Sequence, residues 1–224
     1  MKDRTDGVLD TGDNPKRDDR PVSTEEFSEF CRLLYERDLV RGAGGNLSAR
    51  VGDRILMTPS GYSLRDVAPG SIVTIDMKGN VLYGEIPSKD LEMHLGILRV
   101  RADIDVVCHV HGAAIIAATT LLEAGRNALP PLTPGFVYFA HPLAMIPFMV
   151  PGSEELAAAV KDYFSDTECR ALLLQNHGLV TVGKELEEAL NIAEEIDEAA
   201  RIWLLTEGRA KVISEEDVIR IKRL

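Results

Sequence analysis

Apolar residues recur along the chain with two spacings, and each spacing predicts a different kind of element. Residues spaced by three and four positions share one face of a helix, whereas short apolar runs between turn residues are typical of strands. Helices are predicted to begin at Ser23, Ser153 and Ser214 and to cover residues 89–101, 113–122 and 185–207. Strand-like runs cover residues 47–50, 54–57, 71–75, 81–83, 106–111, 145–148 and 171–174. The stretch 129–135 has neither spacing and is predicted to be irregular.

This mixture of strands and helices predicts an α/β or α+β fold. The sequence has neither a regular strand–helix–strand rhythm nor a G-x-G-x-x-G motif, which argues against a dinucleotide-binding fold. A chain of 224 residues suits one domain with appendages. Residues 1–22 carry eleven charges and few apolar side chains, so we expect a flexible tail there. We expect the folded domain at residues 23–208 and a short C-terminal helix at residues 209–224.

The charge balance limits the partners of the chain. Lys and Arg number 25 against 36 Asp and Glu, which gives a formal net charge of −11. Nucleic acids and anionic membranes require a basic footprint, so neither is expected as the main partner, whereas a small anion remains possible. Three cysteines without a C-x-x-C motif fit a reducing compartment, and no apolar stretch resembles a membrane span or a signal peptide. We therefore expect a cytoplasmic protein.

Three of the five histidines follow or end apolar runs. His109 and His111 end the run 106–111, and His177 follows the run 171–174. Residues i and i+2 of a strand point to the same face, so the first two imidazoles aim at one point, which His177 can reach in a folded chain. Three neutral imidazoles with an open fourth position form a catalytic type of metal site. A hydrogen-bonded structural role is the alternative for each histidine alone, but the three together favour a metal.

Three further segments carry groups suited to binding an anion. Asn46, Ser60 and Ser88 offer neutral donors, and Lys89 adds a positive charge. Neighbouring glycines, including Gly61, allow close approach of a backbone N–H to an oxyanion. Tight turns and helix capping remain the alternatives for each segment, and Asp90 also suits the first turn of a helix.

The order of these motifs resembles the class II aldolase/adducin family, which includes fuculose-1-phosphate aldolase and ribulose-5-phosphate 4-epimerase. The motifs that carry the resemblance are GGNLSAR from Gly44, TPSG from Thr58, PSKDLEMH from Pro87, HVH from His109 and NHG from Asn176. Five elements match in order over residues 24–208. Adducin-like structural members lack the histidine ligands, so their presence here favours an enzyme over a non-catalytic assembly module.

The resemblance implies a fold and an assembly. The family fold is a three-layer α-β-α arrangement, in which helices flank both faces of a central, mostly antiparallel sheet. Family members form homotetramers, with active sites between neighbouring subunits.

The resemblance also implies roles for individual residues. It makes His109, His111 and His177 the metal ligands and Asp90 the catalytic base or a fourth ligand. A tyrosine proton donor of the aldolases falls near Phe136, and Tyr138 is the candidate to replace it. The residues that fall where the family binds a substrate phosphate are Asn46, Ser60, Gly61, Ser88 and Lys89.

Several positions depart from the aldolase pattern. The aldolases have threonine at the position of Ala43, a second serine at that of Lys89 and glutamate at that of Asp90. An aspartate there is more similar to the epimerase. Lys89, together with the segments 129–134 and 150–152, is more similar to a branch that decarboxylates 3-oxo sugar-acid phosphates.

These reactions share the need to stabilise an enediolate, which a divalent ion can do as a Lewis acid. We expect a lyase of the aldolase type, ahead of a decarboxylase, with an epimerase or dehydratase behind. Zn²⁺ is the expected ion, with Mn²⁺ as the alternative, because imidazole and carboxylate ligands do not single out zinc. His94 lies one helical turn after Asp90, so it either orients site groups or only packs. His141 is assigned to a loop or the surface.

Overall fold

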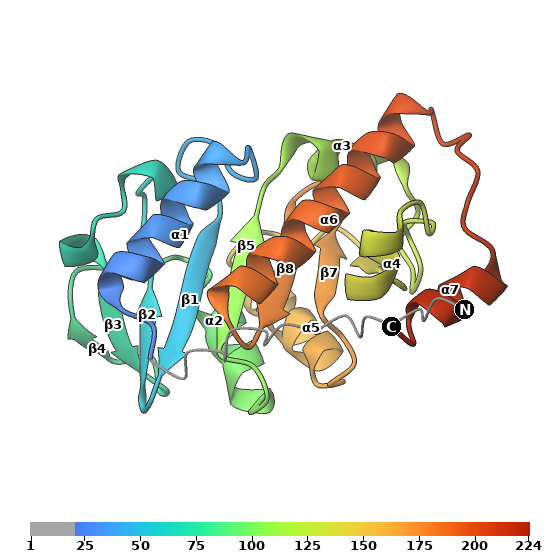
Figure 1. Cartoon of the computed structure of the whole chain (residues 1–224). Helices are drawn as coiled ribbons and strands as arrows, with labels where there is room; N and C mark the ends of the chain where they lie inside the picture. Colours follow the sequence, from blue (N-terminus) through green and yellow to red (C-terminus); the bar gives the residue numbers. More distant parts are fainter. Residues whose placement is uncertain (1–20) are drawn as a thin grey trace, which may run out of the picture.

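A computed structural model describes residues 21–224 and shows a sheet between two layers of helices (Figure 1). Most of the predicted tail, residues 1–20, lies outside the described residues. The eight strands are ordered β4-β3-β2-β1-β5-β8-β7-β6, and every neighbouring pair is antiparallel except β6 and β7. The strands are β1 (Asn46–Val51), β2 (Arg54–Met57), β3 (Val73–Asp76), β4 (Val81–Tyr83), β5 (Val106–Val110), β6 (Ala144–Ile146), β7 (Ala171–Leu174) and β8 (Gly178–Gly183). The predicted three-layer, mostly antiparallel fold is thereby confirmed.

Two apolar cores lie on opposite faces of the sheet because strand side chains alternate between the faces. One core joins the sheet to α1, α3, α4 and α6, and the other joins it to α2 and α5. Within β5, Cys108 belongs to the first core and Val107 to the second. The helices are α1 (Thr24–Glu36), α2 (Leu91–Val100), α3 (Ala113–Leu121), α4 (Pro134–Phe139), α5 (Glu154–Phe164), α6 (Leu186–Leu205) and α7 (Glu215–Ile221), with 3₁₀ turns at Leu64–Asp66 and Pro69–Ser71.

Serine caps set the start of three helices as the sequence predicts. The hydroxyls of Ser23, Ser153 and Ser214 accept hydrogen bonds from backbone N–H groups three residues later. The predicted irregular stretch 129–135 is only partly irregular, because Thr133 caps α4 and Pro134 occupies its first turn. Pro is tolerated at the start of a helix, where its missing N–H would have no helical partner.

None of the helices within residues 21–224 combines the length and the apolar character needed to cross a bilayer.

Candidate metal centre and active site

The centre of the sheet brings together residues that are far apart in the chain. Strand β5 lies between β1 and β8, and its His109 is in register with Asn46 of β1 and Val180 of β8. Successive side chains of β5 point to opposite faces of the sheet, so His109 lies on the same face as Val107. Helices α2 and α5 cover this face. His111 directly follows the end of β5, and His177 directly precedes the start of β8. Because these two strands are antiparallel, both histidines lie at the same end of the sheet.

The three histidines converge as the sequence predicts. The Nε2 atom of His109 lies 2.9 Å from Nε2 of His111 and 3.3 Å from Nε2 of His177. One ligand atom from each of the three side chains lies within 4.8 Å of the others. His109 is fully buried, His177 is buried and His111 is half-buried, so the cluster is largely shielded from solvent.

Two glycines make room for the His111 imidazole. A Cβ atom on Gly44 would lie 2.7 Å from Nδ1 of His111, and one on Gly178 would lie 2.9 Å from its Cδ2. Both distances are shorter than side-chain contacts allow, so any larger residue at either position would displace the ring. The sequence suggested that glycine at position 44 serves anion binding, whereas the structure shows it in contact with a proposed metal ligand.

Hydrogen bonding and burial keep lone pairs available at the cluster. Nδ1 of His109 donates to the carbonyl of Leu179 over 3.0 Å, which leaves its Nε2 unprotonated in the neutral ring. Burial, followed by the two neighbouring histidines, holds the pKa of His109 well below its usual value. Burial lowers the pKa of His111 to about 4 and also lowers the pKa of His177. All three rings are therefore neutral at pH 7, the state that binds a metal.

The donor set fits a divalent ion better than it fits internal hydrogen bonding. Nε2 of His109 has a single lone pair but faces two other ring nitrogens, and only one of them can donate to it. Tetrahedral zinc with bonds of about 2.0–2.1 Å separates its nitrogen ligands by roughly 3.3 Å, which is similar to the 2.9 Å and 3.3 Å from Nε2 of His109 to its two neighbours. An ion shared by the three Nε2 atoms would satisfy all of them.

Asp90 lies beside the cluster and does not use its side chain to cap α2. It occupies the N-cap position, but its carboxylate makes no capping hydrogen bond. Oδ2 accepts instead from Nδ2 of Asn46 over 2.7 Å. The carboxylate also raises the pKa of His111 and His177, in opposition to burial, because its negative charge is close to both. Such a carboxylate can accept or deliver a proton next to a bound ion.

Two loops that carry predicted anion-binding groups are joined to each other. Pro59 and Pro87 form an isolated β-bridge, so the segment with Ser60 and Gly61 runs beside the segment with Ser88. Ser60 N donates to the carbonyl of Ile86 over 2.9 Å. A Cβ atom on Gly61 would meet open space, but the φ of +78° favours glycine there.

The second loop leads directly into α2, which begins after Asp90. The Ser88 hydroxyl accepts from the backbone N–H of Asp90 over 3.3 Å. Lys89 is exposed and forms no ion pair with any residue from 21 to 224, so its charge is available to a ligand. A small hollow beside Lys89 and Asp90 is lined also by Gly152, which belongs to the segment 150–152 that the sequence grouped with Lys89.

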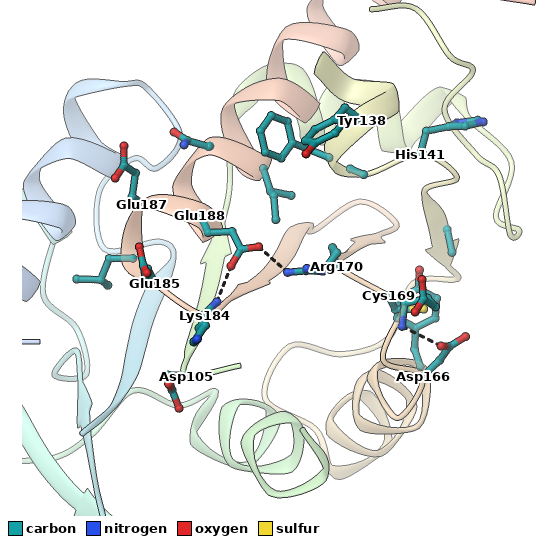
Figure 2. A pocket seen from close by; sticks show the side chains of 18 of the residues that line it. Asp105, Tyr138, His141, Asp166, Cys169, Arg170, Lys184, Glu185, Glu187 and Glu188 are labelled. Carbon is teal, nitrogen blue, oxygen red and sulfur yellow. Dashed lines mark hydrogen bonds and ion pairs between the residues drawn. The ribbon is translucent and has the colours of Figure 1, made fainter. Parts of the chain in front are cut away.

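Tyr138 is not brought to the histidines within one chain. It lies on α4 with 52% of its surface exposed and lines a wide groove. Figure 2 shows this groove, where Glu188 lies between Arg170 and Lys184. The groove adjoins residues just before β5 and just after β8, at the opposite end of these strands from the metal centre. His141, assigned to a loop or the surface, lines the same groove and is half-buried.

Sequence reasoning missed one residue of the site, Ser48. Its hydroxyl is fully buried and lies 2.7 Å from Nδ1 of His94. The other ring nitrogen of His94, Nε2, contacts the side chain of Asn46. The sequence could have indicated Ser48, because residues 46 and 48 of one strand point to the same face of the sheet.

Comparisons with known proteins agree with this geometry. Residues 25–204 match the family model described as Class II Aldolase and Adducin N-terminal domain. The chain is 36% identical over 177 residues to an L-fuculose phosphate aldolase of Methanococcus maripaludis, covering 79% of this chain and 93% of the relative. It is 33% identical over 187 residues to a 3-oxo-tetronate 4-phosphate decarboxylase of Haemophilus influenzae, covering 83% and 88%.

Solved structures extend the similarity to three dimensions. An L-fuculose 1-phosphate aldolase superimposes with a TM-score of 0.80 at 30% identity, over 89% of this chain and 94% of the other. YgbL from Escherichia coli superimposes with a TM-score of 0.84 at 27% identity, over 89% and 97%.

Proposed function

The chain is an enzyme of the class II aldolase and adducin family, and from that premise we propose that it is a divalent-metal-dependent lyase that cleaves a carbon–carbon bond in a small phosphorylated hydroxy-carbonyl compound. The observation that carries the proposal is the convergence of three neutral imidazoles beside the Asp90 carboxylate. His109, His111 and His177 would hold the ion. When bound, a divalent ion supplies Lewis-acid stabilisation of the negative charge that develops on substrate oxygens. Zn²⁺ is our first choice and Mn²⁺ the alternative.

The residues of the chain have separate tasks in this scheme. Asp90 moves the proton of the substrate hydroxyl or carbon next to the breaking bond, because it is the carboxylate beside the three ligands. The loops that carry Ser60, Gly61 and Ser88 bind the substrate phosphate through neutral N–H and O–H donors. Lys89 contributes the positive charge. The Asn46 amide nitrogen has two hydrogens, so it can donate to Asp90 and still offer one to the anion.

Aldol cleavage is our leading reaction, and decarboxylation of a 3-oxo sugar-acid phosphate is the second. The aldolase of Methanococcus maripaludis supports the first and the decarboxylase of Haemophilus influenzae supports the second. Lys89 favours the second specifically, since its charge, which has no ion-pair partner within residues 21–224, could contact a substrate carboxylate that an aldolase substrate lacks. Epimerisation and dehydration rank behind both.

We also propose a homotetramer in which active sites lie between subunits. The exposure of Tyr138 and its distance along the sheet from the histidines support this, since Tyr138 could act as proton donor only at a site of a neighbouring copy. Sedimentation of the purified protein tests the assembly: a monomer at micromolar concentration would contradict it.

A substrate panel tests the reaction. The purified protein is analysed for metal content and then incubated with L-fuculose 1-phosphate and with a 3-oxo-tetronate 4-phosphate. An aldolase produces an aldehyde and a ketone phosphate from the first compound, whereas a decarboxylase releases CO₂ from the second. A protein that binds no metal and converts neither compound would contradict the proposal and support a non-catalytic assembly module.

A further inference from the structure

A line of four hydrogen-bonded side chains runs from the buried interior of the sheet to Asp90. The Ser48 hydroxyl lies 2.7 Å from Nδ1 of His94, and Nε2 of His94 lies 2.5 Å from Oδ1 of Asn46. The line ends at Asp90, whose Oδ2 accepts from Nδ2 of Asn46 over 2.7 Å. Ser48 and His94 are at most 1% exposed and Asn46 is 6% exposed. The three members before Asp90 are therefore shielded from solvent that could replace their bonds, whereas Asp90 itself is half-buried.

The carboxylate at the end of the line fixes the direction of every bond. An ionised carboxylate only accepts, so Asn46 must direct its nitrogen toward Asp90 and its oxygen toward His94. The ring of His94 must then carry its proton on Nε2 in order to donate to that oxygen. Its Nδ1 is left as an acceptor, and the hydroxyl of Ser48 donates to it. A reversal at any member would leave two acceptors or two donors facing each other in a buried place, which is costly.

Burial favours the neutral ring that this arrangement requires. Burial lowers the pKa of His94 to about 4, although the charge of Asp90 acts in the other direction. A neutral imidazole has one donor and one acceptor, so it transmits an orientation from one neighbour to the other.

We infer that Ser48 and His94 are positioning residues, which lock the Asn46 amide with its nitrogen toward Asp90 and so hold that carboxylate beside the three histidines. The inference rests on the proposed role of Asp90 as the group that moves a proton. It adds two residues that touch neither the ion nor the substrate. Groups that orient a metal site from outside commonly change activity by about 10–100-fold when they are replaced.

Two substitutions of His94 separate positioning from packing. In His94→Gln, the amide oxygen can accept from Ser48 and the amide nitrogen can donate to Asn46, so the direction of the line is preserved. In His94→Leu, both bonds are lost but an apolar side chain fills the buried site. We expect kcat to fall about tenfold or more in His94→Leu and to recover to within about threefold in His94→Gln, with full metal content in both variants. If His94 only packs, His94→Gln should have no advantage over His94→Leu, because both side chains fill the buried site.

The protonation of the ring provides a readout that does not depend on activity. In metal-loaded protein labelled with ¹⁵N-histidine, NMR distinguishes the protonated from the unprotonated ring nitrogen. We expect the proton of His94 on Nε2 in the unaltered protein. A proton on Nδ1, or equal activity of both His94 variants, would overturn the inference. If no tested substrate is converted, or if His94→Leu fails to fold, the NMR result still decides the inference and leaves the proposed reaction to the substrate panel.

Discussion

The two ends of the central strands differ in how their polar groups are used. At one end, three histidines that are buried or half-buried direct nitrogen lone pairs at a common point. At the other end, a much wider groove contains a carboxylate whose two oxygens are already bonded within the protein, as Figure 2 shows for Glu188. Arg170 lies 2.6 Å from Glu188, and the backbone N–H of Lys184 donates to the same carboxylate over 2.7 Å.

If the active site lies at the histidines, as we propose, the size of a hollow does not identify it in this chain. Paired charges are already satisfied and have little left to offer a ligand, whereas neutral imidazoles that face each other are not satisfied by the protein alone. Buried polar atoms that the protein itself leaves without a partner indicate a binding site better than the size of a hollow does. Substitutions at both ends can break or sharpen this comparison.

Removal of a ligand should have the largest effect. We expect His109→Ala or His177→Ala to lose the metal and abolish turnover, because two imidazoles cannot complete the site. The fold should be largely preserved, as judged by circular dichroism. Elemental analysis of each purified variant checks the prediction. A full metal complement in both would mean that the histidines do not form the metal site.

Asp90→Asn should have the next largest effect. Asparagine has nearly the same shape but cannot accept a proton, so the rate should fall roughly a hundredfold or more. The alternative of helix capping predicts a cost of about 1 kcal/mol or less in stability and no loss of rate, since asparagine caps equally well. Steady-state kinetics and thermal unfolding of the same preparation distinguish the two. Normal turnover in Asp90→Asn would favour the alternative, although the structure shows no capping bond from this side chain.

Lys89→Ala should have an intermediate effect that depends on the substrate. If Lys89 binds the phosphate, KM should rise about tenfold for a phosphorylated compound, because one charge-assisted bond is lost, and should hardly change for its dephosphorylated analogue. Inorganic phosphate should also inhibit competitively. A KM that is equal for both compounds and unaffected by the substitution would show that phosphate does not bind there. A larger change with a 3-oxo acid would instead favour contact with a carboxylate.

A substitution in the groove should have the smallest effect. Glu188→Gln removes the charge that pairs with Arg170 at a partly exposed site, and such pairs contribute about 1 kcal/mol or less. We expect kcat and KM to stay within about twofold of the unaltered enzyme. A loss of activity comparable to that of Asp90→Asn would mean that the groove takes part in the reaction, and the contrast between the two ends would fail.

Local sequence patterns are sufficient to predict the parts of the site that lie on one element. Strand parity aligns His109 with His111, and a serine three residues before the N–H that donates to its hydroxyl marks the start of α1. The family, the three-layer fold and the convergence of the histidines agree with what the sequence predicts.

Contacts between elements are a different matter. The bond from Asn46 to Asp90 depends on the register of β1 against β5 and on the height of α2 over the sheet, neither of which is encoded in local spacing. The close approach of Gly44 to His111 has the same origin. Tyr138 illustrates a third case, since its helix begins inside a proline-rich stretch that has no periodicity to interpret.

The site residues are widely separated along the chain, so the proposed metal centre can form only after distant segments have come together. His109 and His177 are 68 positions apart and Asn46 and Asp90 are 44 apart, yet they meet at adjacent strands and the helix above them. No short segment can assemble the site before β1, β5 and β8 have paired, which makes it a late product of nonlocal contacts. An ion that binds only the finished arrangement would stabilise the whole domain by mass action and not a single loop. Occupancy of the three histidines would thus report on the integrity of the entire sheet.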